Sequence, residues 1–161
     1  MIEAVRRLSE KRQDFQFHFI GGEELQQHIA LAKEKGVLDN FIVFHGELPY
    51  DEVPAYYAMS ICLVMFSNFE SLPCVIVEAL SCGIPVISTD VGGIKEYITA
   101  KEGILIPKGD IDSLVEAMNY MLDNYTSYNN QYLANYAREN FSIEAVAEKF
   151  RNIYKSVLMD A

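Results

Sequence analysis

Short apolar runs alternate with amphipathic stretches along almost the whole chain, and this alternation limits the possible folds more than any other feature. Runs rich in Ile, Val and Phe predict strands, whereas apolar residues repeated at helical spacing predict helices. Strands are expected at residues 15–20, 41–44, 61–66, 85–88 and 104–106, and helices at 2–13, 23–35, 51–58, 73–81, 93–98, 111–122 and 143–157, with a helix–turn region at 124–140. Strands joined through helices form a parallel sheet with helices on both faces. The sequence therefore predicts a single doubly wound, Rossmann-like α/β domain over residues 1–161.

The charge balance excludes one class of partner. The 161 residues include 13 Lys and Arg against 23 Asp and Glu, which gives a formal net charge of -10. A surface this acidic repels polyphosphate at long range, so we expect no nucleic-acid partner. A small anionic ligand remains compatible with this charge, because backbone amides and helix N-termini bind phosphate without basic side chains.

The cysteine content and the hydropathy pattern indicate the compartment. Cys62, Cys74 and Cys82 are odd in number, form no CxxC pair and lie in apolar or small-residue surroundings, so we expect buried, reduced thiols. The N-terminus has no apolar signal region, and no apolar run approaches the roughly 20 residues that a membrane span requires. We therefore expect a cytoplasmic location and no transmembrane segment.

The segment from Phe66 to Gly93 contains the strongest indication of a ligand site. The apolar strand expected at 61–66 leads into a loop and then into a helix that is expected to begin at Pro73, a residue type suited to the first helical position. The N–H groups of Cys74 and Val75 have no partner inside such a helix and point outward at the carboxyl edge of the sheet. This arrangement predicts an anion site, and a diphosphate is the expected ligand.

Glu78 interrupts the otherwise apolar helix of this segment. A buried carboxylate without a hydrogen-bonding partner is strongly unfavourable. Because helical side chains lean toward the N-terminus, Glu78 is directed back toward the amides of Cys74 and Val75. Two ribose hydroxyls would satisfy it there. The alternative, in which Glu78 lies on the exposed strip of the helix without a special role, is equally compatible with the composition of the helix.

Several motifs resemble one known enzyme family. Glu70-x7-Glu78, the stretch EALSCGIPVIST that begins at Glu78, and the following DVGGIKE occur in the order and spacing of retaining glycosyltransferases of the GT-B fold, the large family 4. The resemblance extends to the Gly21-Gly22 turn and to the strand expected at 104–106. It therefore covers nearly the whole chain, but only the C-terminal, donor-binding domain of such an enzyme.

The resemblance implies a hexosyltransferase whose donor is a UDP- or GDP-sugar and whose acceptor is a glycan or a lipid-linked sugar. Glu70 would be the catalytic residue beside the donor sugar, with helix capping as its alternative role, and Glu78 would bind the ribose. The remaining donor-binding residues would be Ser71, Leu72, Cys74 and Val75 at the diphosphate, Gly21 and Gly22 beside the phosphates, and Glu47 and Leu48 beside the base. No metal or cofactor is expected. Such enzymes assemble polysaccharides, and the full enzyme could lie against the inner membrane.

The chain departs from the family pattern at its start. Residues 2–13 correspond to the helix that follows the first strand of the family's donor domain, so that strand and its basic residue pair have no counterpart here. In the strand order 3-2-1-4-5-6 the first strand is central, and a sheet without it has two unpaired edges. We expect a truncation that also leaves out the N-terminal acceptor domain. The flanking strands closing together, or a strand from another chain, are the alternatives.

Two other readings of the function stay open from the sequence. Without its N-terminal domain the chain would bind a nucleotide-sugar but not turn it over, and a GT-B nucleotide-sugar epimerase would share the fold.

Three further features are ambiguous in the sequence. Asp110-Ile111-Asp112 spells a metal-binding DxD pattern, but its place before an amphipathic helix favours Asp110 as an N-cap. His45 lies at the end of an expected strand, where contact with a ligand is possible. Gly92-Gly93 is compatible either with a simple helix start or with close approach of a substrate.

Overall fold

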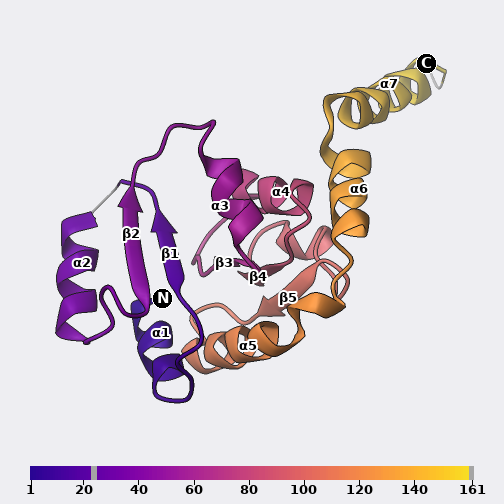
Figure 1. Cartoon of the computed structure of the whole chain (residues 1–161). Coiled ribbons are helices and arrows are strands. Elements are labelled where there is room, and N and C mark those ends of the chain that lie inside the picture. Colours follow the sequence, from indigo (N-terminus) through magenta and orange to yellow (C-terminus); the bar gives the residue numbers. More distant parts are fainter. Residues whose placement is uncertain (23–24, 160–161) are drawn as a thin grey trace.

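The computed structural model describes residues 1–22 and 25–159 (Figure 1). The helices are α1 (Ile2–Ser9), α2 (Leu25–Glu34), α3 (Val53–Met59), α4 (Cys74–Ser81), α5 (Ile111–Asn124), α6 (Asn130–Phe141) and α7 (Ile143–Met159), with 3-10 turns η1 (Ile94–Glu96) and η2 (Tyr125–Ser127). The strands are β1 (Phe17–Ile20), β2 (Ile42–Gly46), β3 (Leu63–Met65), β4 (Val86–Thr89) and β5 (Gly103–Ile106). Every expected strand is present with small shifts at its ends.

Two expected helices are shorter in the structure. The helix expected at 2–13 ends at Ser9, after which Arg12 turns back to form ion pairs with Asp14 and Asp123. The helix expected at 93–98 is only the 3-10 turn η1. The first two residues of the helix expected at 23–35 lie outside the described residues, and the described part of that helix begins at Leu25.

The strands form two separate parallel sheets. β1 pairs with β2, with Phe17 opposite Ile42, and β3 pairs with β4, which pairs with β5. Among the described residues no backbone hydrogen bond joins β1 to β3. The sheet is therefore divided at the place where the strand order predicts a missing central strand, and the flanking strands have not closed together.

Helices cover both faces of this divided sheet, as the alternation of strands and helices predicts. One core contains the apolar faces of α1 and α5 together with Ile42 and Ile87. The other core contains the apolar residues of α4 and α6 together with Val86 and Ile94. Neighbouring residues of β4 pack into different cores, so this strand is buried on both faces. Burial on both faces explains why its sequence is apolar, as is typical of a parallel sheet.

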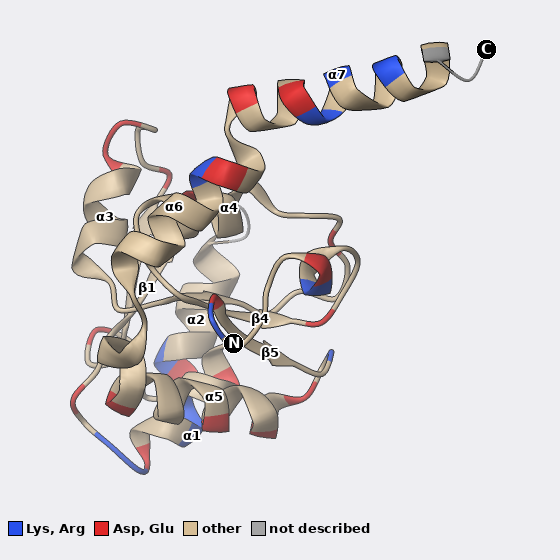
Figure 2. Cartoon of the chain, turned by 90° about the vertical axis from the view of Figure 1, so that its right-hand side faces the viewer, with Lys and Arg blue, Asp and Glu red and all other residues tan. Residues whose placement is uncertain are grey.

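Helix α7 leaves its apolar stripe exposed. The sequence predicts a helix at 143–157, and in the structure the apolar stripe of α7 is exposed, with Ile143 at 85% and Phe150 at 56% of full exposure. The helix projects away from the rest of the chain and is connected to α6 through Ser142, whose hydroxyl accepts a hydrogen bond from the N–H of Ala145 (Figure 1). Basic and acidic side chains are mixed along α7 (Figure 2). None of the described helices combines the length and the apolar character that crossing a membrane requires.

The cysteines are less buried than expected. Cys74 and Cys82 are exposed, and only Cys62 is half-buried. Cys74 is the first residue of α4 and Cys82 is its C-cap, so both lie at exposed ends of the helix, where an apolar sequence context does not imply burial. Burial raises the pKa of the Cys62 thiol to about 12.

Candidate functional site

The N-terminus of α4 leaves two backbone donors free. Pro73 is the N-cap of α4, with extended backbone, rather than the first helical residue, and its carbonyl accepts a hydrogen bond of 3.1 Å from the N–H of Ile76. The N–H groups of Cys74 and Val75 make no hydrogen bond within the described part of the chain. Both residues are exposed, so the first turn of α4 presents unpaired amides and the positive end of the helix dipole to its surroundings.

A side chain of β4 holds the start of the loop that precedes α4. The buried Thr89 hydroxyl accepts a hydrogen bond from the N–H of Ser67 at 3.2 Å and donates one to the carbonyl of Ser67 at 2.8 Å. One hydroxyl therefore holds both backbone groups of the first loop residue, and this fixes the direction in which the loop leaves β3.

A close backbone contact holds the other end of the same loop. Gly92 has a φ of 58°, and a Cβ at this position would lie 1.9 Å from the carbonyl oxygen of Glu70. The N–H of Gly93 donates to the carbonyl of Ser71 at 2.9 Å. The absence of a side chain at Gly92 thus allows the loop that carries Glu70 and Ser71 to pack closely against this turn. This structural role is a third one, beside the helix start and the approach of a substrate that the sequence left open.

The side chains of this loop are accessible. Glu70 and Leu72 are half-buried and Ser71 is exposed. The Glu70 carboxylate forms no hydrogen bond or ion pair with any described residue, so it does not cap α4. Its oxygens remain available to a molecule at the carboxyl edge of the sheet.

Glu78 lies one turn further along α4 and has a partner that the sequence did not indicate. The Tyr57 hydroxyl of α3 lies 3.2 Å from the Oε2 atom of Glu78 and 3.3 Å from the carbonyl oxygen of Val75. Burial and the adjacent Glu78 carboxylate raise the pKa of Tyr57, which therefore remains a hydrogen-bond donor. Glu78 itself is half-buried, between the two situations that the sequence left open. No sequence signal distinguishes Tyr57 from the neighbouring Tyr56.

The ends of β1 and β2 form a second part of the carboxyl edge. The N–H of Gly21 donates to the carbonyl of Gly46 at 2.8 Å, and a Cβ on Gly22 would lie 2.6 Å from the side chain of Glu47. Gly22 and the side chain of Glu47 therefore lie against each other, although they are distant in sequence. Glu47 is exposed and Leu48 is half-buried.

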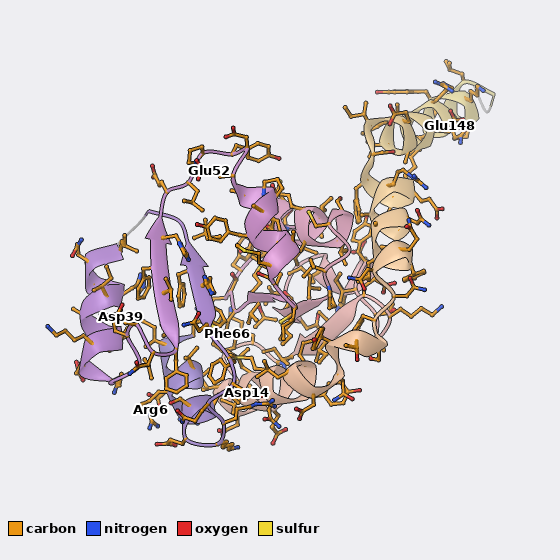
Figure 3. The ribbon with its side chains drawn as sticks, viewed as in Figure 1. Arg6, Asp14, Asp39, Glu52, Phe66 and Glu148 are labelled. Atoms are coloured by element: carbon orange, nitrogen blue, oxygen red, sulfur yellow. The ribbon has the colours of Figure 1, made fainter. Side chains whose placement is uncertain are left out.

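A cleft of about 730 Å³ lies between β1, α3 and β3. Val75 and Glu78 of α4 line it, as do Tyr57 and Ile20, the residue before Gly21. Figure 3 shows the side chains in the region between β1 and α3. The other expected site residues, Glu70, Ser71, Leu72, Cys74, Gly21, Gly22, Glu47 and Leu48, are not among the residues that line this cleft. The structure therefore brings Glu78 and Val75 to the cleft, and leaves Cys74 at the start of α4 and the remaining candidates on the loops around the carboxyl edge.

His18, which lines the cleft, is stacked on His45. The Nδ1 of His18 and the Nε2 of His45 are 2.8 Å apart, and the Tyr56 hydroxyl lies 3.3 Å from the Nδ1 of His45. Partial desolvation and the neighbouring His45 lower the pKa of His18. His45, at the end of β2, is thus in contact with His18 and Tyr56 of the chain itself. The three side chains connect β1, β2 and α3.

The DxD pattern serves a structural purpose. Asp110 is the N-cap of α5, and its carboxylate accepts hydrogen bonds from the backbone N–H of Ser113 at 3.0 Å and from the Ser113 hydroxyl at 2.7 Å. These bonds lower the pKa of Asp110. The expected capping role is confirmed. The described residues contain no group of three or more His, Cys, Asp or Glu side chains arranged to hold a metal ion.

Comparison with known sequences identifies a family. A family model described as glycosyl transferases group 1 matches residues 1–140. The chain is 33% identical over 124 residues to the 2-deoxystreptamine glucosyltransferase of Streptomyces kanamyceticus, an alignment that covers 76% of this chain and 32% of that protein. The chain thus spans about a third of the length of this relative.

Solved structures share the fold. The sucrose-phosphate synthase of Thermosynechococcus elongatus superposes with a TM-score of 0.81 at 23% identity, over 99% of this chain and 43% of that one. Anabaena Alr3699/HepE in complex with UDP superposes with a TM-score of 0.79 at 18% identity, over 96% of this chain and 44% of that one. These likenesses establish the GT-B type of α/β architecture for the chain.

Proposed function

The chain belongs to the glycosyl transferases group 1 family, and we propose that it is the donor-binding domain of a retaining, family 4 glycosyltransferase. In this proposal the donor is a UDP- or GDP-sugar, and a hexose passes to a glycan or lipid-linked acceptor in polysaccharide assembly. The observation that carries the proposal is the pair of unbonded amides at Cys74 and Val75, with the Glu78 carboxylate one turn further along the same helix.

The diphosphate of the donor would bind at the first turn of α4. Two free N–H groups and the helix dipole favour a dianionic group at this position without any basic side chain. When the glycosidic bond of the donor breaks, the departing nucleoside diphosphate gains negative charge. The same amides, together with those of Ser71 and Leu72 in the preceding loop, would stabilise that charge. The proposal therefore requires no metal.

The ribose would bind at Glu78. The Tyr57 hydroxyl donates to the Oε2 atom, and no described residue donates a hydrogen bond to the Oε1 atom, which is available to accept hydrogen bonds from ribose hydroxyls. Glu70, whose carboxylate is unpaired among the described residues, would face the donor sugar. The contact between Gly22 and Glu47 would place Gly21 and Gly22 beside the phosphates, with Glu47 and Leu48 beside the base.

The acceptor site would lie on an N-terminal domain of the same enzyme. The chain covers 32% of the first relative and 43% of the sucrose-phosphate synthase chain, so most of each of those proteins has no counterpart in it. In this proposal the isolated chain binds the donor without turnover. The complete enzyme works in the cytoplasm, where nucleotide-sugars are the donors.

A calorimetric titration of the chain tests the proposal. Of the solved structures, Alr3699/HepE holds UDP, so UDP and UDP-glucose are the first ligands to titrate, with GDP and GDP-mannose as the second pair. We expect one of the two nucleoside diphosphates to bind. If the folded chain binds neither, the donor site proposed at α4 is wrong.

Two variants locate the site within the chain. Glu78→Ala is expected to weaken binding of the nucleoside diphosphate itself by roughly tenfold or more, because it removes charge-assisted hydrogen bonds. Glu70→Ala is expected to weaken only the sugar-bearing form. Glu116→Ala, which removes an exposed glutamate of α5 that forms no ion pair or hydrogen bond with a described residue, is the control and should bind as the unmodified chain does. Equal affinities for all three variants would contradict the assigned roles.

A further inference from the structure

Three side chains from three elements form a continuous series of hydrogen bonds. The Nδ1 atom of His18 on β1 lies 2.8 Å from the Nε2 atom of His45 on β2, and the Nδ1 atom of His45 lies 3.3 Å from the hydroxyl oxygen of Tyr56 on α3. The rings of His45 and Tyr56 also meet edge to face, with 4.7 Å between their centroids. The series therefore attaches α3 to both strands of the two-stranded sheet.

The short distance between the two imidazoles fixes the number of hydrogens between them. A neutral imidazole carries hydrogen on one ring nitrogen and accepts a hydrogen bond at the other, whereas a charged imidazole donates from both. At 2.8 Å the facing nitrogens of His18 and His45 share one hydrogen. Two hydrogens would collide, and with none the two lone pairs would face each other.

A first added proton leaves this bond intact but sets its direction. If His18 takes the charge, its Nδ1 donates to His45, whose own hydrogen then lies on Nδ1. If His45 takes the charge, both of its nitrogens carry hydrogen. In either case the Nδ1 of His45 donates to Tyr56, and the Tyr56 hydroxyl can only accept.

A second added proton cannot be accommodated in the same geometry. With both rings charged, both facing nitrogens carry hydrogen, so the bond between them is lost and two positive charges lie side by side. Desolvation and the neighbouring His45 already lower the pKa of His18 from its usual 6.5. The pair thus holds one added proton, and the second is expelled or separates the rings.

The surroundings of the pair do not offset a second charge. The titratable groups that line the cleft with His18 are the amino group of Met1, Asp14, Tyr50, Tyr56, Tyr57, Cys62 and Glu78. Glu47, two residues after His45, lies against the turn that follows β1. Among the described residues neither imidazole forms an ion pair, and the Asp14 carboxylate is paired with Arg12.

Helix α3 depends on these bonds more than a packed helix would. It has seven residues, and none of them is buried. Such a short helix without buried side chains has little packing to hold it in place. Consecutive tyrosines attach it on two sides, since Tyr56 reaches His45 and Tyr57 reaches Glu78 and the carbonyl of Val75.

We propose that His18, His45 and Tyr56 form an acid-sensitive latch for α3, which stays closed with one added proton on the histidine pair and opens with the second. Opening frees α3 from β1 and β2 and weakens the hold of Tyr57 on Glu78. The latch does not depend on the nucleotide-sugar proposal, because it rests only on the hydrogen bonds of these three side chains.

The sign of the pH effect follows from the lowered pKa of His18. A group whose pKa is lower in the folded chain stabilises that chain above its ordinary pKa, here 6.5, and this contribution is lost as the pH falls through the lowered value. The latch is therefore closed at neutral pH and opens in acid.

A titration of the imidazole ring signals by NMR tests the shared proton. The complete chain contains only three histidines, so each ring signal can be assigned with single variants. His18 and His45 are expected to titrate in two coupled steps more than about one pH unit apart. In His45→Ala the remaining His18 should titrate in a single step. His28→Ala, which removes the histidine of α2, is the matched control and should leave the coupled steps unchanged.

Hydrogen exchange of the α3 amides tests the link to the helix. After correction for the intrinsic pH dependence of exchange, protection of these amides is expected to fall roughly tenfold between about pH 7 and pH 4.5 in the unmodified chain and in His28→Ala. In His45→Ala it should be low at both pH values. Tyr56→Phe should lower the protection of α3 at neutral pH while the two histidines still titrate as a coupled pair.

The other outcomes contradict the inference. Independent, single-step titration of His18 and His45 in the unmodified chain would show that they share no proton. Coupled titration without loss of protection in α3 would show that the pair does not hold the helix. An equal acid-induced loss in His45→Ala would assign the effect to other groups. The buried amides of β4 must stay protected over the same pH range, and their simultaneous loss would mean that the whole chain unfolds and that no separate latch exists.

Discussion

The hydroxyl of Tyr57 and the Oε2 atom of Glu78 are 3.2 Å apart, which joins the only carboxylate of α4 to α3. Tyr57 also reaches the carbonyl of Val75, so one side chain holds two groups of the helix whose first amides are free. The orientation of Glu78 therefore depends on a helix that is distant from it in the sequence.

Removal of the Tyr57 hydroxyl should weaken the site without emptying it. In Tyr57→Phe the Glu78 carboxylate loses one hydrogen bond, and we expect the affinity for UDP to fall about three- to tenfold. Calorimetry on the folded variant measures this loss. Tyr50→Phe is the matched control, because Tyr50 is exposed and its hydroxyl forms no hydrogen bond within the described part of the chain. Unchanged affinity in Tyr57→Phe would mean that Tyr57 does not position Glu78.

Substitution of Gly92 should disturb the loop that carries Glu70. A Cβ at Gly92 would collide with the carbonyl oxygen of Glu70, and the left-handed backbone adds its own strain. We expect Gly92→Ala to lower the free energy of unfolding by about 3 kcal/mol or more, measured by urea denaturation. Gly109→Ala is the matched control, since Gly109 has a φ of 75° but open space around it. It should lose only about 1–2 kcal/mol. Equal losses would refute the collision with the loop.

The buried Glu102 predicts a dependence of stability on alkaline pH. Its carboxylate accepts hydrogen bonds from the Thr99 hydroxyl at 2.6 Å and from the Tyr132 hydroxyl at 2.6 Å. The bond to Glu102, together with burial, raises the pKa of Tyr132 from its usual 10 to about 12. A raised pKa means that this contribution to stability is complete below pH 10 and is lost as the pH rises through about 12.

Tyr132→Phe should therefore be less stable than the unmodified chain below pH 10, by about 1–2 kcal/mol in urea denaturation. The difference should shrink between pH 10 and pH 12, because the unmodified chain loses the bond there. Tyr120→Phe, which removes an exposed hydroxyl from α5, serves as the control. A constant difference across this range would contradict the assignment to Tyr132.

The three cysteines should react with N-ethylmaleimide in a fixed order. Cys74 is exposed at the first turn of α4. Cys82 is exposed too, but burial and the nearby Glu78 raise its pKa. Cys62 should react last, because its pKa is raised to about 12. Mass spectrometry of the labelled peptides measures the three rates. A saturating concentration of UDP should slow the labelling of Cys74 and leave Cys82 unchanged, whereas equal slowing of both would argue against a diphosphate at the N-terminus of α4.

Much of the fold and part of the site follow from local sequence. The five apolar runs correspond to the five strands of the structure. A strand that is buried on both faces, such as β4, is apolar at every position, so it can be recognised without knowing which strands lie next to it. The N-cap roles of Asp110 and Ser142 were also predictable, since a cap depends on residues within the same turn. The free amides at Cys74 and Val75 follow from the start of a helix alone.

The tertiary structure decided what depends on contacts between distant segments. The pairing of Tyr57 with Glu78, the contact of His18 with His45 and the approach of Gly92 to Glu70 each join residues that no spacing rule connects. The exposed stripe of α7 shows the same limit, because periodicity reveals that a helix has an apolar face but not what covers it. The alternation of strands and helices determined a doubly wound parallel sheet. Only the hydrogen-bond ladders decided that its two halves remain apart, since pairing between β1 and β3 depends on which edges meet in space.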